Sequence, residues 1–175
     1  DAIARHRGKY LADLELEILR ISEYFDGLGV LGLEYLSGWD HKIGLADAIK
    51  ADLDKDRRLG KTHQGAHRAD LVVKIDGASA AQRLSRGQLK RLIYILKLAQ
   101  ASLYKKRTTE SCIFLLDDLP AELDGNHRRI FCQWLEQLSC QVFITSVDHE
   151  ALADVWQPST DVMASTLADG RLHSE

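Results

Sequence analysis

A long apolar helix, followed by an apolar strand that ends in two carboxylates, constrains the fold of this chain more than any other feature. Apolar side chains recur at helical spacing from residue 88 to about residue 104. The strand, residues 112–116, leads directly into Asp117-Asp118. A second helix at 126–138 and a second apolar strand at 141–145 follow. Helices that alternate with apolar strands predict an α/β layer with a largely parallel sheet in the second half of the chain.

The first half is predicted to be mainly helical. An apolar seam marks an amphipathic helix from residue 1 to about residue 25, and we interpret the seam as core packing rather than as an autonomous coiled coil. One or two short strands are expected within 28–39, a charged helix at 45–59, and a strand at 69–75 that ends in the turn Asp76-Gly77. The seam positions, separated by alternating steps of three and four, are Leu11, Leu14, Ile18, Ile21 and Phe25.

Length and composition fit a folded chain of two parts. With 175 residues, of which 45% are hydrophobic, the chain can bury one good core or two small ones, which excludes intrinsic disorder. We place a mainly helical lobe at residues 1–64 and a second part at residues 65–175. The second part closes with an expected hairpin at 161–172, turned by Asp169-Gly170.

Cysteines, apolar runs and the N-terminus predict a soluble, cytoplasmic protein. The three cysteines lie among apolar residues without a CxxC pair, and we interpret them as reduced core thiols. No run of eighteen apolar residues and no signal-peptide pattern is present in the sequence. The sequence opens without Met inside a predicted helix, so we expect it to be a piece of a longer protein.

The start of the long helix is a candidate phosphate site. Leu84-Ser85-Arg86-Gly87-Gln88 forms a small, Gly-containing turn at the mouth of the helix. The free N–H groups and the positive dipole end of such a helix favour a phosphate, and Ser85 adds a hydroxyl. An ordinary helix cap is the alternative for this segment taken alone.

The strand-end carboxylates are the candidate catalytic residues. Asp117 is expected at the carboxyl edge of the sheet, where α/β folds bind ligands and where Mg²⁺ can be held through water. Asp118 is the candidate base or water-positioning group. A strand-end turn without a catalytic role is the alternative for this pair taken alone.

Taken together and in this order, the segments 84–88, 112–118 and 121–124 resemble the signature motif, Walker B strand and D-loop of the ABC-type ATPase superfamily, which includes the SMC-type heads. Within it, the chain resembles the RecF family. The segment Gly65-Ala66-His67-Arg68-Ala69-Asp70-Leu71 is similar to the family's Gly-Pro-His-Arg/Lys-x-Asp-Leu, the strand ends in Asp-Asp rather than Asp-Glu, and Ser37-Gly38-Trp39 shows a weaker similarity.

The resemblance implies the C-terminal part of an ABC-type, SMC-like ATPase head with a mainly helical second lobe. ATP and Mg²⁺ would bind only with an N-terminal part that holds the Walker A loop, so the full-length protein would be a weak ATPase and this chain alone inactive. Asp117 would act as Mg²⁺ ligand and, with Asp118, as catalytic residue. The residues implied to contact the nucleotide are Ser85, Arg86, Gly87, Gln88, Asp124 and Ser146.

The resemblance also implies partners. Two heads would sandwich ATP in an ATP-dependent homodimer, bind DNA at gaps or at junctions of single and double strands, and help to load RecA with RecO and RecR. Two alternatives remain open from the sequence: another SMC-like head, and a non-catalytic protein-binding module of the same fold.

The chain also departs from the family pattern. Ala66 replaces the usual Pro, and Ser146 stands where ABC transporters have a switch His, which argues against γ-phosphate sensing by an imidazole. Asp118 in place of Glu predicts slow hydrolysis, suited to a switch rather than a motor. Leu59-Gly60-Lys61-Thr62 is not a phosphate loop, because it lacks the upstream Gly and follows a helix.

DNA contacts are expected from local basic patches, since 23 Lys and Arg against 26 Asp and Glu give a net charge of −3. A solvated helix face with a basic loop is the alternative interpretation. Without interleaved aromatic residues, binding is expected to be sequence-independent and salt-sensitive. The DNA-binding candidates are Arg57, Arg58, Lys61, Arg68, Lys105, Lys106 and Arg107.

Overall fold

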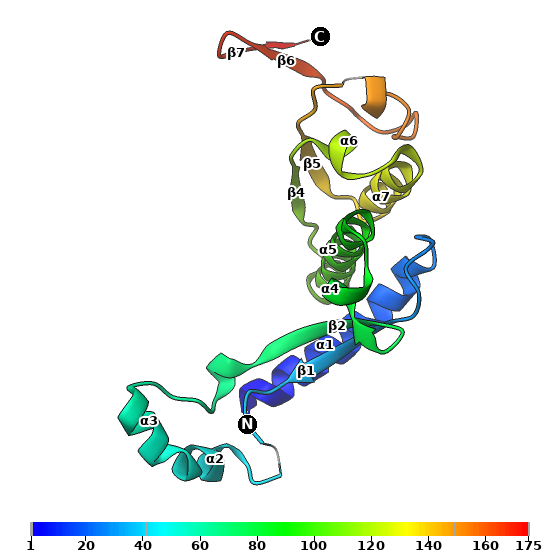
Figure 1. Ribbon diagram of the computed structural model, residues 1–175. Coiled ribbons are helices and arrows are strands. Elements are labelled where there is room, and N and C mark those ends of the chain that lie inside the picture. Colours follow the sequence, from blue (N-terminus) through cyan, green and yellow to red (C-terminus); the bar gives the residue numbers. More distant parts are fainter. Residues whose placement is uncertain (1, 41, 149, 175) are drawn as a thin grey trace. The chain divides into compact units, whose positions relative to one another are not determined.

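The computed structural model describes residues 2–40, 42–148 and 150–174 (Figure 1). They form two compact units, Asp1–Cys112 and Ile113–Glu175, which are described one at a time. The predicted α/β fold class is confirmed, because both units combine helices with strands.

Two long helices form the core of the first unit. The predicted seam of α1 (Ala2–Ser22) is buried at Leu14, Ile18 and Ile21, and the helix packs against α5 (Arg86–Thr108). On α5, the apolar positions 92, 95 and 98 are buried. Each fully buried aliphatic side chain contributes about 1.5–3 kcal/mol, so this pairing supplies much of the unit's stability.

A three-stranded antiparallel sheet accompanies the helix pair, in the order β1 (Leu31–Leu36), β2 (Asp70–Ile75), β3 (Ala78–Ser79). The predicted turn at Asp76-Gly77 is confirmed. Both residues have positive φ, 48° and 81°, as a two-residue hairpin loop requires. Strand β3 and the short helix α4 (Ala80–Arg83) were not predicted, because two and four residues are too few to show a period.

The predicted helix at 45–59 is wrong in one respect, since it is two helices, α2 (Leu45–Ala51) and α3 (Leu53–Leu59). Asp52 lies between them with φ −94° and ψ 2°, and its carboxylate accepts a hydrogen bond of 2.9 Å from Gln64 Nε2. This contact with a distant residue favours the break. Gly60 ends α3 in the left-handed conformation, which agrees with a loop rather than a phosphate site at 59–62.

The two compact units divide at a different place from the predicted boundary at residue 64/65. Strands β1 and β2 pair along six residues each, so segments on both sides of that boundary share one sheet. Trp39 packs with Ala4 and Ala48 in a small apolar cluster of the same unit. The assignment of residues 1–64 to a family lobe stays a prediction.

The second unit contains the predicted parallel strands. Strands β4 (Ile113–Leu116) and β5 (Gln141–Ile144) run parallel, and α7 (Gly125–Gln137) lies between them in sequence. Phe131 of α7 meets Phe114 of β4 edge to face at 6.2 Å. The alternate β-strand side chains are exposed: 63% for Ile113, 77% for Leu115 and 55% for Phe143. Within the described residues, one face of this small sheet is therefore uncovered.

Short elements complete the second unit. Helix α6 (Leu119–Glu122) follows β4, and the 3₁₀ turn η2 (Glu150–Leu152) follows β5. The predicted terminal hairpin is confirmed as β6 (Ser165–Ala168) and β7 (Arg171–Ser174), turned by Asp169-Gly170 with positive φ at both residues. No helix in the described ranges has the length and apolar character needed to cross a membrane.

The described cysteines form no disulfide bond with one another. Cys132 is fully buried in α7, whereas Cys112 and Cys140, which were also predicted to lie in the core, are half-buried. Burial, helped by the nearby carboxylate of Glu136, raises the pKa of Cys132 to about 12, so its thiol stays protonated and unreactive.

A buried carboxylate joins α1 to the C-terminal half of α5. Glu17, only 7% exposed, accepts hydrogen bonds from Arg20 at 2.8 Å, from Ser102 Oγ at 2.7 Å and from Lys106. Burial alone would raise the pKa of Glu17, but the bonds from Lys106 and Ser102 and the charge of Arg20 outweigh it and lower the pKa. Glu17 therefore stabilises the folded state in its ionised form.

The Glu17 network predicts a pH-dependent stability. Because the pKa is lower in the folded state, the stabilisation is present above the unfolded value of 4.5 and is lost as the pH falls through the folded value. We expect Glu17→Gln to lower the free energy of unfolding at pH 7 by roughly 1–2 kcal/mol, toward the low end for charged hydrogen bonds because Arg20 and Lys106 are half exposed. Urea unfolding of the wild type and the variant, at pH 7 and again below pH 4, measures the difference in the free energy of unfolding. Glu23→Gln, at an exposed position, is the control; equal losses in both variants would contradict the assignment.

Candidate functional site

The first candidate site lies at the start of α5, where a capping box fixes the backbone. Ser85 is the N-cap residue, and its Oγ accepts a hydrogen bond of 3.3 Å from the Gln88 N–H. In return Gln88 Oε1 accepts one of 2.9 Å from the Ser85 N–H. The ordinary helix cap considered from the sequence is thus present, and it occupies the Gln88 side chain. The Ser85 hydroxyl proton is not used by these bonds.

Two backbone donors remain at this helix start. Within the described residues, no acceptor binds the N–H of Arg86 or of Gly87, and both residues are exposed. A Cβ placed on Gly87 would meet no atom within 4 Å, so the space beside it is open. Unpaired N–H groups at the positive end of a 23-residue helix are suited to an anion.

The turn after α1 is attached to this helix start by contacts that the sequence did not predict. Gln88 Nε2 donates to the Gly27 carbonyl at 2.7 Å. One helical turn further along, Arg91 donates to the Asp26 carbonyl at 2.9 Å and lies 3.6 Å from the Asp26 carboxylate. More than sixty residues separate these partners, so no local pattern could have found them. They fix the position of Ser85–Gln88 relative to the end of α1.

The second candidate site lies after β4, in the other unit. Asp117 Oδ1 accepts a hydrogen bond of 2.6 Å from the hydroxyl of Thr145, which follows β5. The same hydroxyl oxygen accepts one of 3.1 Å from the Asp118 N–H. Asp118 has the left-handed φ of 45° that Asp tolerates better than most residues. Sequence reasoning missed Thr145, although parallel strands in register place residues that follow them side by side.

The carboxylate of Asp118 is available for chemistry. It makes no hydrogen bond to any residue in the described ranges and does not cap α6, which begins beside it. An acceptor without a protein partner at a strand end can orient a water molecule.

Asp124 and Ser146 serve local turns of the second unit. Asp124 caps α7 by accepting from the His127 N–H at 3.1 Å, and its carboxylate also lies 2.7 Å from His127 Nδ1. Ser146 Oγ donates to the Asp148 carbonyl at 2.7 Å and accepts from its N–H at 3.0 Å. Their contact with a nucleotide stays a prediction.

A Mg²⁺ ion fits this strand end only together with a nucleotide. The described part of the chain holds no cluster of three His, Cys, Asp or Glu residues able to bind a metal. Mg²⁺ commonly takes one or two carboxylates, several waters and phosphate oxygens. Asp117, with one oxygen bound by Thr145 and the other open, matches that requirement.

The basic candidates differ in how many of their charges are already used. Lys106 pairs with Glu17, and Arg107 pairs with Asp13 and lies over the Tyr10 ring at 5.4 Å. Among the described residues, the side chains of Arg58 and Lys61 make no ion pair or hydrogen bond, and both residues are exposed. The charges at the end of α3 are therefore more available to a polyanion than those at the end of α5.

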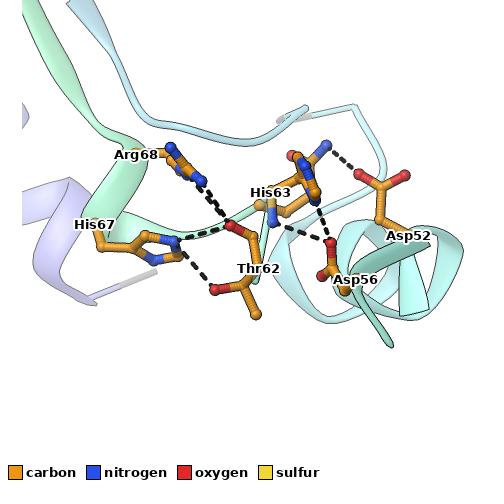
Figure 2. Close-up of polar contacts among 7 residues, drawn as sticks. Asp52, Asp56, Thr62, His63, His67 and Arg68 are labelled. Carbon is orange, nitrogen blue, oxygen red and sulfur yellow. Dashed lines mark hydrogen bonds and ion pairs between the residues drawn. The ribbon is translucent and has the colours of Figure 1, made fainter. Parts of the chain in front are cut away.

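The loop that joins α3 to β2 is held by its own polar groups. Figure 2 shows His67 and Arg68 directed at Thr62, whose carbonyl accepts from Arg68 Nη2 at 3.0 Å. His67 Nε2 lies 3.2 Å from Thr62 Oγ1, and His63 Nδ1 lies 2.5 Å from the buried Asp56 (Figure 2). Arg68 thus has a structural partner as well as its predicted role toward DNA.

Two segments that carried the family resemblance meet in the first unit. The Gly65 N–H donates to the Gly38 carbonyl at 2.9 Å. A Cβ on Gly38, which has φ +88°, would lie 2.4 Å from the Gly65 carbonyl oxygen. Only glycine fits this close approach, so a side chain at position 38 would separate the two segments.

Comparison with known proteins gives consistent matches. The RecF/RecN/SMC N terminal domain model matches residues 14–167. Proteins named DNA replication and repair protein RecF are similar to this chain: that of Chromohalobacter salexigens is 51% identical over 85% of this chain and 41% of its own length. The RecF protein of Pseudomonas putida is 41% identical over 97% of this chain and 46% of its own length. The chain spans less than half the length of these curated relatives.

Two solved structures share the fold. They are described as the recombination mediator protein RecF of the RecFOR pathway, one with ATP and one with ATPrS. Their TM-scores are 0.78 and 0.75 at 23% and 21% sequence identity, and each match covers 99% of this chain and 46% of the solved chain.

Proposed function

Because the chain belongs to the RecF/RecN/SMC N-terminal domain family, we propose that it forms the C-terminal portion of a RecF-like recombinational DNA-repair ATPase. It supplies the signature motif and the Walker B strand, and the rest of the full-length protein supplies the Walker A loop. The relatives named RecF support this proposal, since they are more than twice as long as the matched segment.

The unpaired N–H groups of Arg86 and Gly87 are the observation that carries the proposal. They lie at the positive end of α5 beside the Ser85 hydroxyl, whose proton is free to be donated to a phosphate oxygen. Because the signature of one head meets the nucleotide of the other, dimerisation completes the active site. Turnover by the full-length protein is weak, and this chain alone is inactive.

The strand end of β4 performs the chemistry. Asp117, which accepts a hydrogen bond from Thr145, would hold Mg²⁺ through water, and Asp118 would orient the attacking water. Mg²⁺, when bound with ATP, neutralises the charge of the phosphates. The residues of this chain thereby contribute ligand orientation and proton acceptance.

Equilibrium binding of a fluorescent ATP analogue to the full-length protein tests the proposal. We expect binding that strengthens when Mg²⁺ is added and that is lost when the upstream part is removed. No binding under either condition would contradict the proposal and favour a non-catalytic protein-binding module of the same fold.

The DNA partner is proposed to be a gap or a junction of single and double strands, bound without sequence preference, with RecO and RecR as protein partners in loading RecA. The solved structures of the same fold are described as RecF in the RecFOR pathway, which supports RecO and RecR as partners, and the relatives named DNA replication and repair protein RecF support a DNA partner. Among the described residues, the side chains of Arg58 and Lys61 are exposed and form no ion pair, which supports the DNA contact. Arg57 is exposed as well and forms an ion pair of 3.8 Å with Asp54.

The DNA contact predicts a change in salt dependence. Each phosphate contact contributes about one to the slope of log affinity against log salt, so Arg58→Ala with Lys61→Ala is expected to reduce the slope by about two. Fluorescence anisotropy of gapped DNA with the full-length protein over a salt series measures it. Arg5→Ala with Lys9→Ala removes the same charge from the exposed side of α1 and is the control. Equal slopes in the two double variants would argue against a DNA contact by Arg58 and Lys61.

A further inference from the structure

Thr145 lies directly after β5 and touches both carboxylate residues of the proposed active site. Its hydroxyl donates to Asp117 Oδ1 at 2.6 Å and accepts from the Asp118 N–H at 3.1 Å. The Thr145 N–H in turn donates to the Leu116 carbonyl at 2.9 Å, which extends the parallel ladder by one residue. One side chain is thus fixed to the sheet and bonded to both candidate catalytic residues.

These contacts restrict the side-chain rotation of Asp117 and the backbone conformation of Asp118, which would otherwise be free to vary at a strand end. A hydroxyl bond to a carboxylate at 2.6 Å has the length of a charge-assisted bond and selects one rotamer of Asp117. The bond from the Asp118 N–H supports a left-handed backbone that costs energy in any residue with a Cβ. A β-branched threonine does this with little loss of entropy, because its χ1 is already restricted.

We propose that Thr145 is a positioning residue for the metal, acting through Asp117 and Asp118 rather than touching the nucleotide. It binds one oxygen of Asp117, which leaves the other oxygen open for a water that Mg²⁺ would bring, and it holds the backbone of Asp118 in the left-handed conformation. This inference rests on the proposed function and adds the residue that orients its metal ligand.

A purely structural role predicts a different result from a positioning role. If Thr145 only joined the ends of β4 and β5, its loss would lower stability and leave the contribution of Mg²⁺ to ATP affinity unchanged. If it orients Asp117, ATP affinity in EDTA stays at the wild-type value and the gain from Mg²⁺ falls. Partners that orient a metal ligand typically change metal affinity by about 10–100-fold.

The test uses the full-length protein and three substitutions. Thr145→Val keeps the β-branched shape and removes the hydroxyl, and Thr145→Ser restores the hydroxyl. Thr160→Val, which removes a hydroxyl bonded to Glu136 elsewhere in the same unit, controls for the loss of any such bond. ATP affinity is titrated in EDTA and over a Mg²⁺ series, and thermal unfolding is recorded for each variant. If Thr145→Val does not fold, Thr145→Ala is measured in its place.

We expect the Mg²⁺ concentration for half-maximal ATP binding to rise by about tenfold or more in Thr145→Val, with Thr145→Ser and Thr160→Val close to wild type. A Mg²⁺ requirement equal to wild type, or a serine variant as impaired as the valine variant, would overturn the inference and leave the proposed function standing. Wild-type protein that fails to bind ATP would overturn both.

Discussion

Asp118→Asn in the full-length protein is expected to reduce ATP turnover by about 10²–10⁴-fold, the range for loss of a group that accepts a proton in the transition state. The asparagine amide cannot take that proton. The substitution should not disturb the backbone at position 118, because Asn adopts the left-handed conformation found there, with φ 45°, as readily as Asp does. A steady-state phosphate-release assay measures the rate.

Asp148→Asn is the control for this prediction. Asp148 is an exposed acidic residue that follows β5, and its carboxylate accepts from the Ala151 N–H at 3.2 Å. The control is expected to turn over ATP at the wild-type rate. Unchanged turnover in Asp118→Asn would remove Asp118 from the chemistry, and the slow hydrolysis inferred from Asp in place of Glu would lose its basis.

Ser85→Arg is expected to abolish turnover while the protein still folds and still binds ATP. The arginine side chain would fill the open space beside Arg86 and Gly87, where the proposed function places the nucleotide of a partner head. Loss of the N-cap oxygen costs about 0.5–2 kcal/mol, which a protein of this size tolerates. ATP binding, thermal unfolding and phosphate release, measured on the same sample, separate the three effects.

Ser85→Ala distinguishes the entry of the nucleotide from the loss of the cap. It removes the same N-cap oxygen, so its stability should match that of Ser85→Arg, but it leaves the two N–H groups accessible. We therefore expect partial turnover in Ser85→Ala and none in Ser85→Arg. Equal turnover in the two variants would argue that this helix start does not meet a nucleotide.

Elements with a clear period could be predicted from the sequence. The buried stripe of α1 and the parallel strands β4 and β5 follow from apolar spacing, and the turns at Asp76-Gly77 and Asp169-Gly170 follow from residues that accept positive φ. The break at Asp52 could not be predicted, because neither Gly nor Pro marks it and its partner Gln64 lies twelve residues away.

The sequence proposes residues for the candidate site, whose functional roles stay predictions, but it does not predict the contacts of those residues. Ser85, Asp117 and Asp118 are recognisable because a helix start and a strand end have simple requirements. The bonds from Gln88 to Gly27 and from Thr145 to Asp117 depend on tertiary placement, which sequence spacing does not encode. For the basic residues, only the structure shows that Lys106 is paired with Glu17 while Lys61 is free of such a partner among the described residues.

Sedimentation velocity of the full-length protein with ATP, with ADP and without nucleotide is the most direct test that the signature at the start of α5 completes an ATP site in a second copy. The account predicts a monomer without nucleotide or with ADP, a dimer with ATP, and no ATP-dependent dimer in Ser85→Arg. A sedimentation coefficient that does not respond to ATP, or a dimer that persists in Ser85→Arg, would contradict it.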